Sequence, residues 1–349
     1  MKIEIHLLQN FAPSCLNRDD ANTPKTCTFG GVSRARVSSQ SWKRAVRDTF
    51  RHENSIPTGI RTKQLAAKLL ERLGDGFEEA KVIKFLEETY SKMDGKRKQE
   101  TAVLLFMSEA EIVEAAACIR EGLSGDKAAP RLKAAQRSAD VALFGRMLAE
   151  KPEFNIDAAC QVAHAISTHQ ADFETDFYTA VDDLTRDRDE VGAGMLGTQG
   201  FNSACFYRYA LVDYKELVAN LGGDRILAET ALQEFLRSFT LTVPTAKQNS
   251  HAAQNRPSFG LFVARKSGTP VSLANAFALP IRSEDLIGAS IYALVRHHAR
   301  LDKVYGIYKD ATQAIFHDRE SDKPLGDLAA YDAETLDQAI KSIIGAVHV

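Results

Sequence analysis

The chain lacks the patterns that mark secreted and membrane proteins. Its five cysteines are scattered and never form a CxxC pair, which favours reduced thiols over a disulfide framework or a structural zinc site. No stretch approaches the roughly 20 apolar residues that a transmembrane helix needs. The first residues, MKIEIHLLQNF, contain no long apolar run of the kind found in a secretory signal. We therefore expect a cytoplasmic protein with no membrane partner.

The sequence also lacks the motifs of nucleotide-dependent and metal-dependent enzymes. Neither GxGxxG nor GxxxxGK[ST] occurs, and there is no HExxH or Cys-His arrangement with zinc spacing. We predict no cofactor, no metal and no catalytic residue. One catalytic alternative stays open, namely a metal-independent endoribonuclease with His164 or His251 as general base.

Positive charge is scarce overall but is concentrated at the front of the chain. The 349 residues have a net charge of −2, whereas residues 1–51 carry nine Lys and Arg against four Asp and Glu, a local charge of +5. The rest of the chain is therefore acidic. A near-neutral protein does not coat nucleic acid with its whole surface, but one basic groove is sufficient because counterion release depends on local contacts.

The order of the predicted elements indicates an α+β fold. Alternating apolar residues predict strands at 1–11, 163–171, 201–214, 259–266 and 271–280, and helical spacing marks 38–51 and 224–239. Between residues 60 and 147 only helical spacing is seen. We predict a ferredoxin-like, RNA-recognition-type β-α-β-β-α-β palm with a large helical insertion. The expected parts are the palm (1–55 and 148–285), the insertion (56–147), a hairpin within the palm (171–204) and a C-terminal helical segment packed on the palm (286–349).

The predicted helix at 38–51 has an apolar side and a separate polar, cationic side. Trp42 and its apolar neighbours form one side, while Gln40, Lys43 and Arg47 follow i, i+3, i+7 spacing and share another. Ser38 or Ser39 is suited to cap the N-terminus, where free N–H groups attract anions. The pattern predicts a cradle that holds a nucleic-acid backbone by its phosphates without reading bases. Arg44 and Arg51 flank this face, and the preceding loop extends the cationic track with Arg18, Lys25, Arg34 and Arg36.

Segments spread over residues 13–277 resemble one known family. They are PSCLNRDD, FGG…R.R.SSQS.KRA.R, GRM, AHAI.THQ, DF.TAVDDL, LGTQ.F.S..FYRYA, LGG, VP.AKQ and LANAF. In this order they are similar to the CasC (Cse4) family of the RAMP superfamily, the backbone subunits of the type I-E CRISPR surveillance complex Cascade.

The resemblance implies a hand-like, non-catalytic protein with a palm, helical fingers and a long β-hairpin thumb. Several copies of such a protein bind side by side along one CRISPR RNA and form a helical filament with the other Cascade subunits. The thumbs kink the guide into segments, which then pair with the target DNA strand in antiviral defence.

The resemblance also implies a role for individual residues. The positions that match RNA contacts are Arg18, Lys25, Ser38, Gln40, Lys43, Arg47, Arg146 and Met147, and those that match the thumb wedge are Tyr178 and Leu196. A second group of candidate RNA contacts consists of Arg34, Arg36, Arg44, Lys247 and Gln248.

Overall fold

The computed structural model describes residues 1–53, 55–97, 99–180, 195–320 and 325–348, with the backbone alone at residues 180, 195 and 196. The strands are β1 (Lys2–Ser14), β2 (Thr26–Phe29), β3 (Val32–Val37), β4 (Ile60–Thr62), β5 (Leu105–Met107), β6 (Cys160–Val162), β7 (Ala165–Ser167), β8 (Glu174–Ala180), β9 (Met195–Asp213), β10 (Phe259–Arg265) and β11 (Thr312–His317). The α-helices are α1 (Ser39–Glu53), α2 (Leu65–Leu73), α3 (Glu79–Thr89), α4 (Glu109–Arg120), α5 (Ala129–Ala134), α6 (Ala139–Phe144), α7 (Tyr214–Asn220), α8 (Arg225–Leu241), α9 (Gln248–His251), α10 (Leu286–Tyr305) and α11 (Leu336–Ala346). The short 3-10 helices are η1 (Gly125–Lys127), η2 (Pro152–Phe154), η3 (Ala274–Phe277) and η4 (Gly326–Tyr331).

The chain divides into two compact units. Unit 1 comprises Met1 and residues 47–161 and 212–235, and unit 2 comprises residues 2–46, 162–211 and 236–349. Helices α1 and α8 and strand β9 each contribute to both units. The domain boundaries expected from the sequence stay a prediction. None of the described helices is long and apolar enough to cross a membrane.

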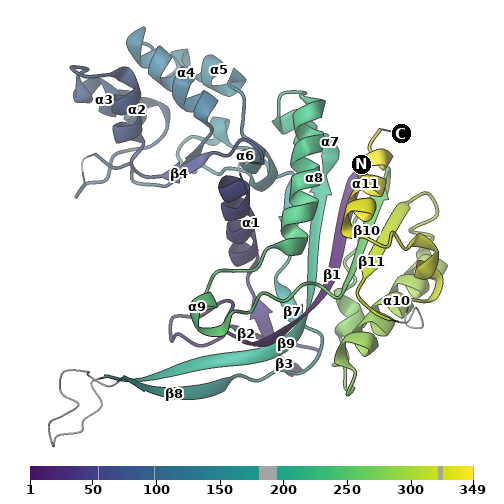
Figure 1. Ribbon diagram of the computed structural model, residues 1–349. Helices are drawn as coiled ribbons and strands as arrows, with labels where there is room; N and C mark the ends of the chain where they lie inside the picture. Colours follow the sequence, from purple (N-terminus) through teal and green to yellow (C-terminus); the bar gives the residue numbers. More distant parts are fainter. Residues whose placement is uncertain (54, 98, 181–194, 321–324, 349) are drawn as a thin grey trace, which may run out of the picture. The chain divides into compact units, whose positions relative to one another are not determined.

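Unit 2 is built on a sheet with the strand order β11-β10-β1-β9-β7-β3-β2. If its four central strands are numbered along the chain, their order is 4-1-3-2, that of a ferredoxin-like unit in which α1 follows β1 and α8 follows β9 (Figure 1). Strand β1 pairs antiparallel with β10, from Lys2↔Arg265 to Leu8↔Phe259. The predicted α+β, ferredoxin-like fold is confirmed.

On one face of this sheet, α1 and α8 close around a buried arginine. Arg208 of β9 is almost fully buried. Its guanidinium lies 3.6 Å from the ring centroid of Trp42 in α1 and 4.6 Å from that of Phe239 in α8. It donates to Gln9 Oε1 at 2.5 Å and to the carbonyl of Phe239. Two aromatic faces and two acceptors compensate the removal of this charge from water, so the cluster fixes the Trp42 side of α1 on the sheet.

The opposite face of the sheet is covered. Tyr207 of β9 packs in one apolar cluster with Phe277 of η3 and Ile291 of α10. Its hydroxyl accepts a hydrogen bond from the Leu273 N–H at 2.9 Å and bonds with His6 Nδ1 at 2.8 Å. RNA-recognition domains stack bases on aromatic residues of an open sheet face. Here α10 and η3 occupy that face, so it offers no stacking platform.

Unit 1 has a separate core formed by its helices. Leu69 of α2, Phe85 of α3 and Ile112 of α4 belong to one buried cluster. Helix α4 begins with a capping box, in which Ser108 and Glu111 satisfy each other's backbone N–H groups at 3.1 and 2.8 Å. The apolar residues at three-to-four-residue spacing, from which these helices were predicted, therefore form the side of each helix that faces the core.

Several short strands differ from the sequence prediction. Residues 271–280 are not a strand but contain η3, and the C-terminal segment expected to be helical contains β11, which pairs with β10. In the insertion, β4 and β5 pair where only helices were expected. Strands β2 and β3 form a hairpin between the predicted strand at 1–11 and the predicted helix at 38–51, where no strand was expected. Strands β2, β4 and β5 are only three or four residues long. So short a run carries almost no periodicity.

The turn between β2 and β3 consists of two glycines with positive φ, +62° at Gly30 and +79° at Gly31. A Cβ on Gly30 would come within 1.7 Å of the Ala278 carbonyl oxygen, whereas a Cβ on Gly31 would meet open space. The first glycine is therefore required both by its backbone conformation and by the close approach of the segment after η3. The second is required by its conformation alone.

The two glycines give a matched pair of variants. Both Gly30→Ala and Gly31→Ala place a side chain at positive φ, which costs about 1–2 kcal/mol. Only Gly30→Ala adds a clash, so we expect it to lower the free energy of unfolding by about 1–3 kcal/mol more. Denaturant titration followed by the fluorescence of Trp42, the single tryptophan, measures the difference. Equal losses would show that the turn moves freely away from Ala278.

Candidate nucleic-acid interface

The loop before β2 is held in one conformation by its own polar groups. The Asp19 carboxylate accepts hydrogen bonds from the Thr23 hydroxyl at 2.8 Å and the Thr23 N–H at 2.9 Å, and these bonds lower the pKa of Asp19. Pro24 rests on β9 at Gly200, where an added Cβ would come within 2.7 Å of the proline ring. The loop is thus seated on the base of the β8–β9 hairpin, with Arg18 exposed at its start.

Asn17 connects this loop to the N-terminus of α1. Its Oδ1 accepts the Ser38 N–H at 2.9 Å, and Ser38 Oγ accepts the Ser41 N–H at 3.4 Å. Ser38 is therefore the N-cap, one of the two serines that the sequence offered. In the part of the chain that the structure describes, the N–H groups of Ser39 and Gln40 donate to no protein acceptor. Free N–H groups at the positive end of a helix dipole form a binding site for a phosphate oxygen.

Cationic side chains extend this site along unit 2. The Lys25 N–H donates to the Asn17 carbonyl at 2.9 Å, which places Lys25 beside the α1 N-terminus. Arg36 lies beside Lys25, since its N–H donates to the Lys25 carbonyl. Its Nη1 is 3.2 Å from His164 Nδ1. Partial burial and then the charges of Arg36 and Lys25 lower the pKa of His164. Lys43 follows one turn into α1.

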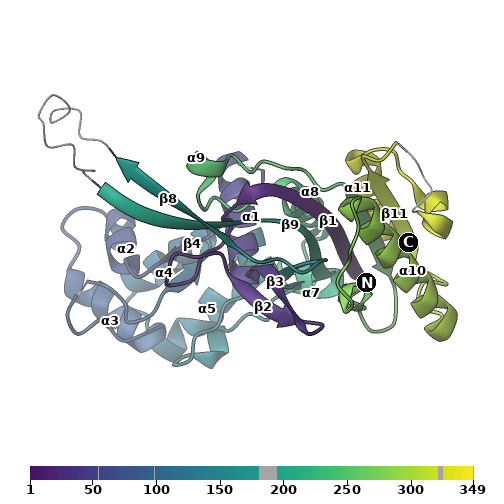
Figure 2. The same cartoon turned by 90° about the horizontal axis from the view of Figure 1, so that it is seen from below.

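A loop distant in the sequence adds Lys247 to the same neighbourhood. Its Nζ donates to Gln199 Oε1 at 3.2 Å, and Gln199 Nε2 lies 2.6 Å from His251 Nε2. Burial raises the pKa of the Cys15 thiol, while the charges of Arg18 and Lys247 both oppose that rise, so both cations lie near Cys15. Helix α9, which follows Lys247, lies beside the base of the hairpin (Figure 1, Figure 2). Lys247 itself has φ +54°, a strained conformation of the kind found at functional sites.

Two other residues of the second candidate group have different roles. The Gln248 amide is used inside its loop, donating to the Pro244 carbonyl at 2.9 Å and accepting from Gln254 at 3.2 Å. Arg34 is fully buried and donates to the carbonyls of Phe29, Ser167 and Phe277 at 3.1, 3.0 and 2.8 Å. A phosphate cannot reach this guanidinium, and we remove Arg34 from the RNA contacts. Arg44 is exposed on α1.

Two of the predicted contact arginines belong to unit 1 and stabilise its interior. Arg47 Nε lies 3.0 Å from Asp140 Oδ2, and its guanidinium lies 4.4 Å from the Phe106 ring centroid. Burial lowers the pKa of Arg47, and Asp140 partly offsets this effect. Arg146 forms a buried ion pair with Glu111 at 2.8 Å. Arg47 does share a face of α1 with Lys43, as its spacing predicts. The guanidiniums of Arg47 and Arg146, however, already have carboxylate partners.

Met147 and Tyr178 are the apolar members of the predicted contacts. Met147 of unit 1 is 83% exposed, so its whole side chain is available. In unit 2, β8 pairs with β9 from Glu174↔Phe201 to Ala180↔Met195. Tyr178 lies across from Gly197, where a Cβ would come within 2.6 Å of the tyrosine ring. Leu196 pairs with Thr179 through its backbone; its side chain and residues 181–194 of the predicted thumb lie outside the described residues.

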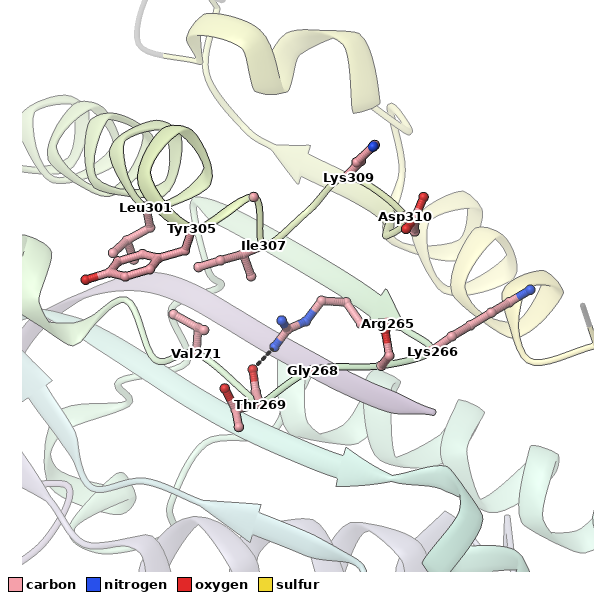
Figure 3. A pocket seen from close by; sticks show the side chains of 12 residues that line it. Arg265, Lys266, Gly268, Thr269, Val271, Leu301, Tyr305, Ile307, Lys309 and Asp310 are labelled. Carbon is pink, nitrogen blue, oxygen red and sulfur yellow. Dashed lines mark hydrogen bonds between the residues drawn. The ribbon is translucent and has the colours of Figure 1, made fainter.

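A hollow at the end of β10 is a different kind of candidate site. It encloses about 440 Å³, with Tyr305 and other apolar side chains along one side (Figure 3). The Arg265 guanidinium donates to the Thr269 carbonyl at 2.6 Å and to Glu4, so its charge is compensated inside the fold. Lys266 and Lys309 also line the hollow (Figure 3). Among the described residues no group of three or more His, Cys, Asp or Glu is placed to hold a metal.

The comparisons with known proteins agree on one family. The CT1975-like protein family matches residues 3–342. The chain belongs to this family. A chain of a "CRISPR RNA-guided surveillance complex, pre-nicking" is 32% identical, with a TM-score of 0.88 over 99% of this chain and 100% of that chain. A chain of a "CRISPR RNA-guided surveillance complex" is 30% identical, with a TM-score of 0.67 and the same coverage. Among curated proteins, none matches.

Two positioning residues of this site escaped the sequence reasoning. Asn17 holds the loop against the α1 N-cap, and Gln199 holds Lys247 and His251. Both occur inside segments that carry the family resemblance, PSCLNRDD and LGTQ. Asn17 and Gln199 are uncharged, and nothing in the sequence alone distinguishes them from other polar residues. Their roles follow only from their hydrogen-bond partners in the fold.

Proposed function

We propose that the chain is the CRISPR RNA-binding backbone subunit of a type I-E surveillance complex, and that it is not an enzyme. It binds the guide by its phosphates, several copies assemble along one RNA with the other Cascade subunits, and kinked guide segments pair with target DNA in antiviral defence. The full-length similarity to chains of CRISPR RNA-guided complexes supports this assignment.

The observation that carries the proposal is the arrangement at the start of α1. Trp42 is buried against Arg208, which orients the helix, and the free N–H groups of Ser39 and Gln40 are left beside Lys25. Such groups contact phosphates and carry no base information. Specificity is then supplied by base pairing of the guide, as in other RNA-guided systems.

Avidity explains how a chain with a net charge of −2 holds RNA. Each copy contributes a few phosphate contacts, and binding of neighbouring copies to one strand makes later contacts effectively intramolecular. Acidic residues elsewhere keep the RNA on the basic track, because they repel phosphates. Met147 and Tyr178 supply apolar surface for displaced bases.

RNA titrations test the proposal directly. Lys25→Ala combined with Lys43→Ala should weaken binding of unrelated single-stranded RNAs equally and reduce the slope of log affinity against log salt by about 0.7 for each phosphate that the variant no longer neutralises. Lys266→Ala combined with Lys309→Ala removes the same charge from the hollow of Figure 3 and should change neither quantity. Fluorescence anisotropy at several salt concentrations measures both, and equal effects of the two double variants would contradict a defined track.

One observation favours the ribonuclease alternative: His164 lies beside Arg36 and has a lowered pKa. A neutral histidine next to a cation is suited to act as a base on RNA. Incubation with labelled repeat-containing RNA, without and then with a divalent metal, distinguishes the two functions. We expect intact RNA; site-specific cleavage that is abolished by His164→Ala or His251→Ala would overturn the non-catalytic assignment.

A further inference from the structure

The hollow at the end of β10 has an apolar end and a cationic end. It encloses about 440 Å³, a size typical of sites that bind small molecules. Tyr305 and Leu301 of α10 lie toward one end, and Lys266 and Lys309 lie away from them (Figure 3). All the residues that line it belong to unit 2. A ligand that fills the hollow therefore combines an apolar part with a negatively charged part.

The apolar end presents an aromatic ring to solvent. Tyr305 is 71% exposed and is the last residue of α10. The helix ends directly after it, at Gly306, in the left-handed conformation. Val271 and Ile307 continue the apolar surface beside the ring (Figure 3). An exposed aromatic ring in the wall of a recess provides a surface on which a second flat ring can stack.

A buried guanidinium lies between the two ends (Figure 3). Arg265 is 5% exposed and forms an ion pair with Glu4, while its Nη2 donates to the Thr269 carbonyl at 2.6 Å. Among the described residues, no acceptor faces its Nε or its Nη1. A side chain at Gly268 would cover Nη1, because an added Cβ would lie 3.5 Å from it. The fold thus fixes this guanidinium and leaves it a donor for an acceptor atom of a ligand.

The cationic end carries two lysines that have no carboxylate partner. Within the ranges that the structure describes, neither Lys266 nor Lys309 forms an ion pair, and Asp310 is the single acidic residue that lines the hollow. The charge of Arg265 is balanced by Glu4, so two ammonium groups face one carboxylate. The balance is positive, and the ammonium groups are available to an anion.

We propose that this hollow binds a free nucleotide. The base stacks on the Tyr305 ring, one of its acceptor atoms takes the free donor of Arg265, and the phosphate lies between Lys266 and Lys309. Stacking on an aromatic ring is open to every base, and lysine binds phosphate as a point charge. The two lysines lie at the end of β10 and after α10, not beside the N-terminus of α1, so the site is separate from the proposed RNA contacts.

Titration of the full chain with nucleoside monophosphates provides the test. Isothermal calorimetry measures AMP and UMP as a purine and a pyrimidine probe. Adenosine and uridine lack the phosphate, and ribose 5-phosphate lacks the base. We expect at least one monophosphate to occupy one site per chain, at least about tenfold more tightly than its nucleoside or ribose 5-phosphate, because each of these loses either charge or stacking. If neither monophosphate shows saturable binding, the site does not exist.

Two double variants locate the phosphate. Lys266→Ala with Lys309→Ala should weaken binding of the monophosphate at least about tenfold, because two charged hydrogen-bond donors are lost. Lys81→Ala with Lys84→Ala removes the same charge from exposed positions of α3 and should leave the affinity unchanged. Equal weakening in both double variants would show that the nucleotide responds only to net charge, and the site would be refuted.

Two single variants separate stacking from charge. Tyr305→Ala should weaken binding of the monophosphate at least about fivefold, the lower end for the loss of one stacked base. Asp310→Asn should strengthen it about two- to fivefold, because a repelling charge is removed. Both side chains are exposed, so circular dichroism should show an unchanged fold. Unchanged affinity in Tyr305→Ala would contradict the stacking.

RNA binding provides the last comparison. Anisotropy with single-stranded RNA should give the wild-type affinity in the Lys266→Ala, Lys309→Ala protein. A loss there would assign the hollow to a nucleotide of the bound RNA and overturn the proposal of a free one. Wild-type protein that binds the monophosphate but no RNA would refute the proposed function and leave the nucleotide site standing.

Discussion

Arg208→Ala is expected to lower the free energy of unfolding by about 3–5 kcal/mol, the range for losing one partner of a buried charged network. The guanidinium fills the space between Trp42 and Phe239 and satisfies Gln9. Its removal leaves a cavity, a Gln9 side-chain oxygen without its donor and a looser α1. Because Trp42 touches Arg208, its fluorescence in a denaturant titration reports this unfolding directly.

Two comparisons separate the sources of this loss. Arg208→Met keeps much of the volume but not the hydrogen bonds, so we expect it to recover part of the stability. Arg300→Ala removes an exposed arginine from the same unit and should change the free energy of unfolding by less than about 0.5 kcal/mol. If Arg208→Ala were as mild as Arg300→Ala, the buried guanidinium would not fix α1, and the orientation of this helix would need another explanation.

The predictable part of this fold is local. Helix α1, its cap at Ser38 and its buried Trp42 side follow from spacing and capping preferences within about 15 residues. Strands β1 and β9 were predicted because each is long enough to alternate. Strand β11 was not, because six residues between two helices resemble a connection until β10 pairs with them.

The roles of the arginines were not predictable in the same way. Arg34 and Arg36 are two residues apart and belong to one basic stretch, yet Arg34 donates to carbonyls 133 and 243 positions away, whereas Arg36 lies beside His164 on the basic track. Local spacing cannot show which guanidinium is buried by distant segments. A count of charge locates the basic region, and only the fold separates its buried arginines from those that the proposed RNA site uses.

Arg146 and Met147, two adjacent residues of unit 1, allow a structural role and a proposed RNA contact to be separated by experiment. Arg146 donates to Glu111 at 2.8 Å and to the carbonyls of Phe106 and Phe154 at 3.0 Å each, whereas the neighbouring Met147 is exposed. We expect Arg146→Ala to destabilise unit 1 by about 3–5 kcal/mol, because Glu111 is left buried without its cation. Hydrogen exchange should then increase across α2, α3 and α4.

Met147→Ala is expected to show the opposite behaviour. An exposed side chain contributes little to stability, so the free energy of unfolding should change by less than about 0.5 kcal/mol. If the thioether is buried against a displaced base, its loss should cost about 1.5 kcal/mol or more per copy, at least about tenfold in affinity. Anisotropy and hydrogen exchange are measured on both variants. An Arg146→Ala protein that stays stable but binds RNA more weakly would contradict the structural role of Arg146. A Met147→Ala protein with unchanged RNA binding would contradict the contact between Met147 and a displaced base.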